Sequence, residues 1–309
     1  MESPRLIFMG TPEFAVGSLQ ALIEAGYNVV AVVTMPDKPA GRGLQLQQSA
    51  VKQYALGQNL PVLQPEKLKD PAFIEELRSY KPDVQVVVAF RMLPVIVWDM
   101  PPMGTINVHA SLLPHYRGAA PINWALINGE KETGITTFKL QHEIDTGNIL
   151  LQEKVTITET ENAGTLHDKL KAVGAKLIVA TLKGLVDNNI VEMPQASFDI
   201  ATLKHAPKLY TETSNIDWLK PVEDIYNLIR GLNPYPAAFT TLHGKKIKLF
   251  DCQFELNNHI HTVAGEASTD GKTVLKFAAK DGFIIVKELQ LEGKKRMKTE
   301  DFLRGYRWP

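Results

Sequence analysis

The chain has 309 residues, of which 44% are hydrophobic and 22% charged, a mix typical of a globular protein with an ample core. This composition excludes a chain disordered throughout, and the single Cys252 excludes an intramolecular disulfide framework or a cysteine-rich zinc site. Basic and acidic residues number 34 each, but residues 208–309 include 16 basic and 13 acidic ones. This small excess of positive charge suits a phosphate-binding surface, and it equally suits an ordinary solvated surface. Residues 1–5 do not begin a signal peptide, and no apolar run reaches the length of about 18 residues that a membrane helix needs. We therefore expect a cytoplasmic protein with no membrane association.

The first half of the chain alternates short apolar runs with amphipathic segments. Strands are predicted at residues 5–9, 28–34, 61–64, 84–90 and 104–109. Helices are predicted at residues 49–56, 71–80 and 121–127, and between an N-cap at Thr11 and a stop at Gly26. Such an alternation predicts a parallel sheet covered by helices on both faces, with ligands bound at the carboxyl ends of the strands.

The second half follows a different pattern. Strands are predicted at 134–140 and 149–158, flanking a turn at 144–147, and a long helix follows at 166–186. After a helix at 222–232, short strands are predicted at 239–242, 247–250, 274–278 and 283–286, separated by glycine-containing turns. We therefore predict an α/β protein. A Rossmann-like parallel-sheet domain at 1–188 and a linker at 189–207 precede a small OB-like β-barrel domain at 208–309, a type of barrel that can bind nucleic acid.

Several familiar motifs are missing from the sequence. Gly10-Thr11-Pro12 follows the first strand but is not Gly-x-Gly-x-x-Gly, which argues against a dinucleotide cofactor. The segment 41–43 lacks the Gly-Lys-Ser/Thr of a P-loop, and no His-Glu-x-x-His or Gly-x-Ser-x-Gly motif is present. The sequence therefore predicts neither a nucleotide-phosphate site of these kinds nor a metal site nor a serine hydrolase.

Two side chains on one predicted strand give the strongest chemical signal. Asn107 and His109 lie two residues apart at its carboxyl end, so they project from one face into the place where such a sheet binds ligand. An amide donor beside a titratable imidazole suits acyl transfer, because one can stabilise an oxyanion while the other handles a proton. Asp145, in a glycine-containing turn, could add a carboxylate to the same crevice. Taken singly, each residue also suits a capping, core or turn position.

A set of longer motifs resembles a known family. They are Phe-Met-Gly-Thr-Pro-Glu-Phe-Ala-Val at 8–16, Pro-Asp-Lys-Pro-Ala-Gly-Arg-Gly at 36–43, Asn-x-His-x-Ser-Leu-Leu-Pro-x-x-Arg-Gly-Ala-Ala-Pro at 107–121, Asp-x-Gly at 145–147, Ile-Asp-Trp at 216–218, Arg-Gly-Leu-Asn-Pro at 230–234 and Asp-Phe-Leu-Arg-Gly at 301–305. Almost from end to end, the chain resembles the methionyl-tRNA formyltransferases. Its Asn/His/Asp set resembles that of the wider superfamily of formyltransferases that use 10-formyltetrahydrofolate.

The resemblance implies a reaction and roles for the residues that match. A formyl group would pass from 10-formyltetrahydrofolate to the α-amine of methionyl initiator tRNA, with no metal. Asn107 and His109 would stabilise the tetrahedral oxyanion, and Asp145 would orient His109 and relay the proton. The implied folate-binding residues are Phe90, Arg91, Met92, Leu93, Ser111, Leu112, Leu113 and Pro114, with residues 141–145 nearby. The implied tRNA-binding residues are Arg42, Lys245, Lys246, Lys248, Lys295 and Arg296. We expect a monomer.

The chain departs from the family pattern at two places. Arg91 replaces a small residue in the folate region, and Leu-Gln-Leu-Gln-Gln at 44–48 replaces most of a basic run after Arg42. If this loop depends less on charge, the C-terminal barrel must hold the tRNA more strongly. Two alternatives remain open. One is a formyltransferase of the same superfamily that acts on a small amine, such as a sugar nucleotide or glycinamide ribonucleotide. The other is a non-catalytic RNA-binding protein on the same fold, against which the intact Asn107, His109 and Asp145 argue.

Overall fold

The computed structural model describes residues 3–40, 45–195, 202–257 and 262–308. The chain forms two compact units, the first of residues 1–117, 134–155 and 167–204, the second of residues 118–133, 156–166 and 205–309. Residues 118–133 and 156–166 thus group with the C-terminal part, although they precede the predicted linker in the chain. The linker at 189–207 was predicted from composition, and composition carries no information about which distant segments pack together. These domain boundaries stay a prediction.

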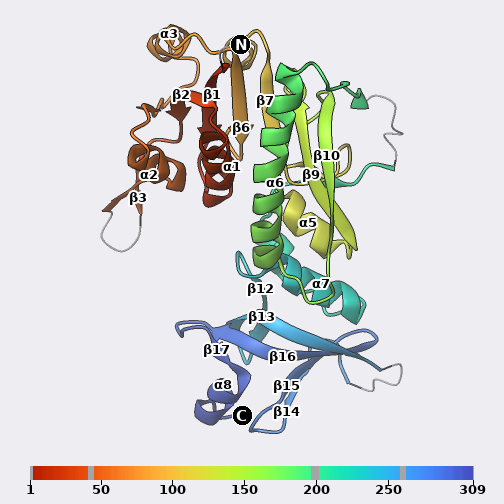
Figure 1. The fold of residues 1–309 in the computed structure, drawn as a ribbon. Helices are drawn as coiled ribbons and strands as arrows, with labels where there is room; N and C mark the ends of the chain where they lie inside the picture. Colours follow the sequence, from red (N-terminus) through yellow and green to blue (C-terminus); the bar gives the residue numbers. More distant parts are fainter. Residues whose placement is uncertain (1–2, 41–44, 196–201, 258–261, 309) are drawn as a thin grey trace. The chain divides into compact units, whose positions relative to one another are not determined.

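A seven-stranded sheet forms the centre of the first unit, in the order β10-β9-β7-β6-β1-β2-β5 (Figure 1). Its strands are β1 (Arg5–Gly10), β2 (Asn28–Val33), β5 (Val62–Leu63), β6 (Val84–Val88), β7 (Thr105–His109), β9 (Glu132–Lys139) and β10 (Ile149–Thr156). Five of them, β1, β2, β5, β6 and β7, pair in parallel, which confirms the predicted Rossmann-like sheet. β9 instead pairs antiparallel with β7, so the part of the sheet beyond β7 is mixed.

Helices cover both faces of this sheet. The helices of this unit are α1 (Glu13–Glu24), α2 (Ala50–Gly57), α3 (Pro71–Ser79), α4 (Val95–Trp98) and α6 (Ala163–Val186). Alternate residues of β1 point to opposite faces, and on one face Ile7 and Met9 join Phe73 of α3 and Val97 of α4 in a single cluster. In α6, which runs along the sheet in green in Figure 1, a Cβ added at Gly174 would lie 3.3 Å from Val108 of β7. The small residue therefore lets α6 pack closely behind the end of β7.

The start of α1 differs from the prediction. Pro12, with extended backbone, occupies the N-cap position, and Thr11 precedes it with its hydroxyl buried and without a hydrogen-bond partner. Proline has no N–H to donate and fits the helix entrance, which shifts the start of the helix by one residue. Ser49 is the N-cap of α2, where its side chain accepts from Lys52 N, at the start of the helix predicted at 49–56.

The sequence did not indicate the two short strands that precede and follow residues 41–44. β3 (Lys38–Ala40) and β4 (Gln45–Gln47) pair antiparallel where a proline- and glycine-rich loop was expected. Arg42, predicted to contact tRNA, lies outside the described residues. The structure therefore leaves its role as a prediction.

The second unit is built on a curled antiparallel sheet in the order β12-β13-β16-β15-β14, with β17 paired to β16. Its strands are β12 (Ala238–Leu242), β13 (Lys245–Leu256), β14 (Ala267–Thr269), β15 (Leu275–Ala278), β16 (Gly282–Leu291) and β17 (Met297–Lys298). The remaining elements are β8 (Arg117–Gly118), α5 (Pro121–Ile127), β11 (His205–Ala206), the 3-10 helix η3 (Glu212–Ser214), α7 (Val222–Leu232) and α8 (Thr299–Gly305). Ile229 of α7 packs with Leu249, Phe277 and Ile284 of the sheet. The predicted barrel is thus a half-barrel closed over by α7. Within the described part of the chain, no helix has the length and apolar character needed to cross a membrane.

Candidate active site

The carboxyl end of β7 presents the two residues that sequence analysis placed together. Asn107 and His109 alternate with Val108 along the strand, so their side chains leave the same face. β7 lies between β6 and β9, where Asn107 pairs with Val87 on one side and with Phe138 on the other. His109 is 7% exposed and Asn107 is half-buried. The central position in the sheet therefore holds both side chains on a rigid strand.

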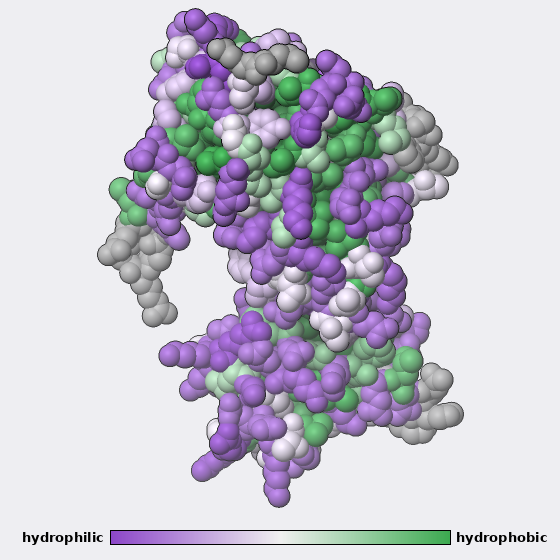
Figure 2. All heavy atoms as spheres, viewed as in Figure 1, coloured by the Kyte–Doolittle hydropathy of each residue, from purple (hydrophilic) through white to green (hydrophobic). Residues whose placement is uncertain are grey.

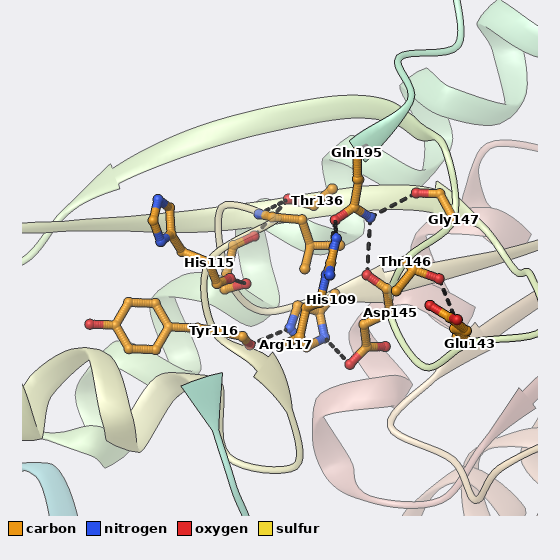
Figure 3. Close-up of polar contacts among 12 residues, drawn as sticks. His109, His115, Tyr116, Arg117, Thr136, Glu143, Asp145, Thr146, Gly147 and Gln195 are labelled. Carbon is orange, nitrogen blue, oxygen red and sulfur yellow. Dashed lines mark hydrogen bonds and ion pairs between the residues drawn. The ribbon is translucent and has the colours of Figure 1, made fainter. Parts of the chain in front are cut away.

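The His109 ring is held between two oxygen acceptors (Figure 3). Its Nε2 lies 2.9 Å from the carbonyl oxygen of Tyr116, and its Nδ1 lies 3.9 Å from Oδ2 of Asp145. A carbonyl can only accept, so Nε2 carries a hydrogen. Nδ1, which faces the carboxylate, is therefore the nitrogen at which the ring can exchange a proton. The structure thus brings together His109 and Asp145, which are 36 residues apart in the sequence.

The turn that carries Asp145 has a demanding backbone. Asp145 has a φ of 55°, in the left-handed region that aspartate tolerates better than most residues with a side chain. A Cβ at Gly147 would lie 1.6 Å from the carbonyl oxygen of Lys139, so only glycine fits there. The backbone N–H of Lys139 donates to Asn148 O at 3.0 Å. The end of β9 therefore fixes one side of the turn.

Two residues with no predicted role hold the other side of the turn. Gln195, which is 5% exposed, donates through Nε2 to the backbone oxygens of Asp145 at 3.0 Å and Gly147 at 2.7 Å. Its Oε1 accepts from Arg117 Nε at 3.1 Å and from a terminal Arg117 nitrogen at 2.6 Å (Figure 3). Sequence analysis missed Gln195 because it lies in the predicted linker, where no pattern distinguishes it. Arg117 belongs to the motif at 107–121, but the sequence indicated no role for it.

The predicted folate-binding residues after β7 form an anchored loop. Ser111 is fully buried and donates to His115 O at 2.7 Å, while its own carbonyl accepts from Thr136 Oγ1 at 2.7 Å. The same Thr136 hydroxyl accepts from Leu113 N at 3.1 Å. Leu113 and Pro114 are buried and Leu112 is half-buried. The backbone of this loop is thus fixed by β9. Of the four residues 111–114, Leu112 is the one that is not fully buried.

The other predicted folate-binding residues follow β6 and differ in exposure. Met92 is 71% exposed, whereas Leu93 is 8% exposed and packs in the same cluster as Val97. Phe90 is half-buried, and the Arg91 guanidinium lies 5.6 Å from the centre of its ring. Ile144, in the predicted folate region beside Asp145, is 59% exposed. Met92 and Ile144 are apolar surfaces of the kind that covers a flat aromatic ligand, while Leu93 serves the core.

Arg91 is tied to a neighbouring loop. Its guanidinium donates to the carbonyl oxygen of Glu66 at 2.8 Å and to that of Pro65, and its Nε is buried without a hydrogen-bond partner. Burial lowers the pKa of this guanidinium from its ordinary value, although an arginine remains charged. Arg91 therefore fixes the segment that follows β5 against the end of β6, which explains how the site accommodates a large residue there.

The predicted tRNA-binding residues of the second unit gather at one end of the β13–β16 ladder. The N–H of Glu292 donates to Lys246 O at 2.9 Å, which brings the turn carrying Lys295 beside the start of β13. Lys245, Lys246, Lys295 and Arg296 are exposed, whereas Lys248 is half-buried and donates to Pro236 O at 3.0 Å. Lys246 Nζ lies 3.5 Å from the centre of the Phe239 ring, and Arg296 lies over Phe250 and pairs with Glu288 at 2.5 Å. On the face of this unit seen in Figure 2, hydrophilic residues predominate.

One group of potential metal ligands occurs among the described residues. Ligand atoms of Glu13, His167 and Asp168 lie within 4.8 Å of one another. Lys171 Nζ already lies 2.6 Å from the Glu13 carboxylate and 4.0 Å from that of Asp168. This ammonium group already pairs with both carboxylates, and we assign no metal to the group.

Comparison with known protein families gives two matches. A model described as formyl transferase matches residues 4–182, and a model described as formyl transferase, C-terminal domain, matches residues 208–307. Together they cover both the site at the end of β7 and the half-barrel.

Individual proteins show similarity over the whole chain. The methionyl-tRNA formyltransferase of Bacteroides fragilis is 54% identical over 99% of this chain and 96% of its own length. That of Porphyromonas gingivalis is 46% identical over 99% and 96%. Among solved structures, an N-formyltransferase from Helicobacter canadensis in complex with folinic acid and dTDP-3-aminofucose has a TM-score of 0.67 at 21% identity, covering 92% of this chain and 98% of its own. HypX from Aquifex aeolicus in complex with tetrahydrofolic acid has a TM-score of 0.62 at 16% identity, covering 98% of this chain and 47% of its own. At these identities the two structures support the fold alone.

Proposed function

The chain belongs to the formyl transferase family, and we propose that it transfers a formyl group from 10-formyltetrahydrofolate to the α-amino group of methionyl initiator tRNA. The observation that carries this proposal is the similarity to methionyl-tRNA formyltransferases over 99% of the chain, C-terminal unit included. The product would be formylmethionyl-tRNA for translation initiation. Because that substrate belongs to the translation machinery, we place the enzyme in the cytoplasm. We also expect it to act as a monomer.

The attacking amine needs little help to lose its proton. An α-amino group has a pKa of about 7.7–8.0, and an ester at its carboxyl lowers that value further. A fraction of the amine is therefore neutral near pH 7 without a strong base. The nitrogen lone pair then attacks the formyl carbon, a C–N bond forms, and the carbonyl oxygen becomes an oxyanion.

We assign the stabilisation of that oxyanion to Asn107 and His109. Both side chains leave the same face of β7, and a strand holds donors in a fixed direction. Because Nε2 keeps its hydrogen on the Tyr116 carbonyl, His109 donates to the oxyanion from Nδ1 in its doubly protonated form. Nδ1 lies 3.9 Å from Oδ2 of Asp145, beyond hydrogen-bond distance, which leaves it available to the reacting group. Hydrogen-bond distances in a catalytic site often shorten only when the substrate is bound.

Asp145 completes the transfer in this assignment. The proton released by the attacking nitrogen passes by way of the Asp145 carboxylate, directly or through water, to N10 of the folate. The bond between the formyl carbon and N10 then breaks, and tetrahydrofolate leaves with the proton. His109 keeps its protons throughout, with Nε2 bonded to Tyr116 O.

The folate lies, in this proposal, between the segment after β6 and the loop after β7. Exposed Met92 and Ile144 supply apolar surface for the pterin, while Phe90, Leu112 and the backbone of residues 111–114 form the walls. The site contains amide, imidazole and carboxylate groups for every step above. The reaction therefore uses no metal.

A single assay tests the proposed function against its alternatives. Purified enzyme is supplied with 10-formyltetrahydrofolate and one acceptor in each of four parallel reactions. The acceptors are charged initiator tRNA, charged elongator tRNA, a sugar-nucleotide amine and glycinamide ribonucleotide. The release of tetrahydrofolate is measured in each reaction. We expect release with methionyl initiator tRNA far above that with the other acceptors. Release with a small amine alone would identify the superfamily alternative. Tight tRNA binding with no release from any acceptor would identify a non-catalytic RNA-binding protein.

A further inference from the structure

The turn that carries Asp145 is held by a side-chain relay from two residues outside the catalytic set. From the geometry we infer that Gln195, oriented by Arg117, is a positioning residue that sets the place of the Asp145 carboxylate for formyl transfer. This inference rests on the proposed function, because it assigns Gln195 a role in the same reaction.

The Gln195 amide can face the turn in only one direction. An arginine side chain has only donors, so the group that Arg117 contacts at 2.6 and 3.1 Å must be the amide oxygen. The NH2 group of Gln195 then has to face the opposite way. Its two hydrogens match two carbonyl oxygens, those of Asp145 and Gly147. Arg117 therefore fixes which end of the amide meets the turn.

The two hydrogen bonds donated by Gln195 hold both ends of the Asp145 turn. Asp145 and Gly147 lie on either side of Thr146, so one NH2 group ties both ends of the turn. Asp145 is in the left-handed region, from which a residue with a side chain relaxes unless its surroundings hold it. The end of β9 constrains the turn at Gly147, and Gln195 contacts the carbonyl oxygen of Asp145 itself. A shift there moves the carboxylate relative to His109 Nδ1.

The contacts between Arg117, Gln195 and the turn are shielded from solvent. Gln195 is 5% exposed and Arg117 is half-buried, so water cannot readily replace either partner. Burial lowers the pKa of Arg117, while the charges of Asp145 and Glu143 oppose that shift. The guanidinium thus lies in the field of the carboxylate that it helps to place.

The replacement Gln195→Glu separates a positioning role from a general structural one. The carboxylate keeps the shape of the amide and gains an ion pair with Arg117, which offsets the two lost hydrogen bonds, so the melting temperature should change little. It cannot donate to the two carbonyls, which it would instead repel at 3.0 and 2.7 Å. A misplacement of about 1 Å typically costs about 10²-fold in rate, so we expect kcat to fall by about that factor with little change in KM for either substrate.

A double-mutant cycle and an independent physical measurement complete the test. In an Asp145→Asn background, Gln195→Glu should cause no further loss of kcat, because the group that it positions is already gone. Arg117→Leu should lower kcat as Gln195→Glu does, and Arg117→Lys, which keeps a donor, should retain more of the wild-type kcat than Arg117→Leu.

Amide hydrogen exchange of residues 143–149 should increase in Gln195→Glu without substrate, and this readout stands even if the true acceptor is not tRNA. Unchanged exchange, normal kcat in Gln195→Glu or an equal loss in both backgrounds would overturn the inference.

Discussion

His109 Nδ1 lies 3.9 Å from Oδ2 of Asp145, while Nε2 of the same ring is bonded to the carbonyl oxygen of Tyr116. The second contact explains why the first matters, because the Tyr116 carbonyl commits one nitrogen and leaves the other to face the carboxylate. The side chains of His109 and Asp145, taken without their backbone, are nearly buried, with 8% and 11% of their surface exposed. In such surroundings a charge interaction is stronger than it would be in water, so this pair is well placed to act on a developing charge.

The assignment of Asn107 and Asp145 predicts a large loss of rate with little loss of binding. Loss of one oxyanion donor costs about 10²–10³ in kcat, and loss of a proton-transfer group about 10²–10⁴, so we expect kcat of Asn107→Ala and of Asp145→Ala each to fall by at least about 10²-fold. Single-turnover formylation with saturating tRNA measures the chemical step, and filter binding measures tRNA affinity. Near-normal turnover in either variant, with affinity retained, would remove that residue from the mechanism.

The close approach at Gly147 predicts that a single methyl group displaces the Asp145 turn. In Gly147→Ala, the new Cβ would clash with Lys139 O, so the turn or the end of β9 must move. We expect kcat to fall by about 10²-fold, as for other small misplacements of a catalytic group. Gly57→Ala is the matched control, because a Cβ at Gly57 meets nothing within 4 Å. If both variants kept full activity, the turn would not need its present backbone.

The sequence predicted the strand that carries Asn107 and His109 but not the residues that hold the Asp145 turn. Asn107 and His109 could be placed together because strand periodicity alone puts residues two apart on one face. Gln195 lies 50 residues from Asp145, in a segment with no regular pattern. Its contacts depend on how the chain returns to the sheet after α6, which local periodicity does not encode. The supporting residues therefore became visible only in the folded chain.

The same distinction applies to the strands of the half-barrel. β13 runs over Lys245–Leu256, but only residues 247–250 were predicted as strand. Its register shifts between Leu249 and Asp251 and again before Cys252, which breaks the alternation of apolar and polar residues that identifies a strand. The short β17 and α8 carry too few residues for a period to show.

Arg91 predicts a variant that weakens folate binding but leaves the chemistry unchanged. Arg91→Ala removes the donors to Pro65 O and Glu66 O and frees the segment after β5 from the proposed folate wall. Because this wall contacts substrate and transition state alike, KM for 10-formyltetrahydrofolate should rise by about tenfold, equivalent to about 1.4 kcal/mol, with kcat retained. Steady-state kinetics at varied folate gives both constants. A fall in kcat at unchanged KM would instead assign Arg91 to the chemical step.

The ion pair of Glu192 predicts a pH-dependent contribution to stability. Hydrogen bonds donated by Lys139 and then by Asn148 lower the pKa of Glu192 below its ordinary value. A lowered pKa in the folded state stabilises the protein above the unfolded value of about 4.3, and this stabilisation is lost as the pH falls through the folded pKa. Glu192 is 34% exposed, so solvent limits the effect to under about 1 kcal/mol. Urea unfolding should show Glu192→Gln less stable than wild type at pH 7, with the gap closing in acid. A gap that does not depend on pH would contradict this account.

The basic end of the β13–β16 ladder predicts how tRNA binding responds to salt. Lys245 and Lys295 are exposed, so replacing either by alanine should leave the fold intact. Each lost phosphate contact should reduce the slope of log K against log salt by about 0.7 to 0.9. Arg296→Ala should reduce the slope as well, but it should also lower the melting temperature, because Arg296 packs on Phe250 and pairs with Glu288. Lys69→Ala, an exposed lysine of the first unit, is the matched control and should leave the slope unchanged. Equal slopes for Lys245→Ala, Lys295→Ala and Lys69→Ala would show that the tRNA is held elsewhere on the protein.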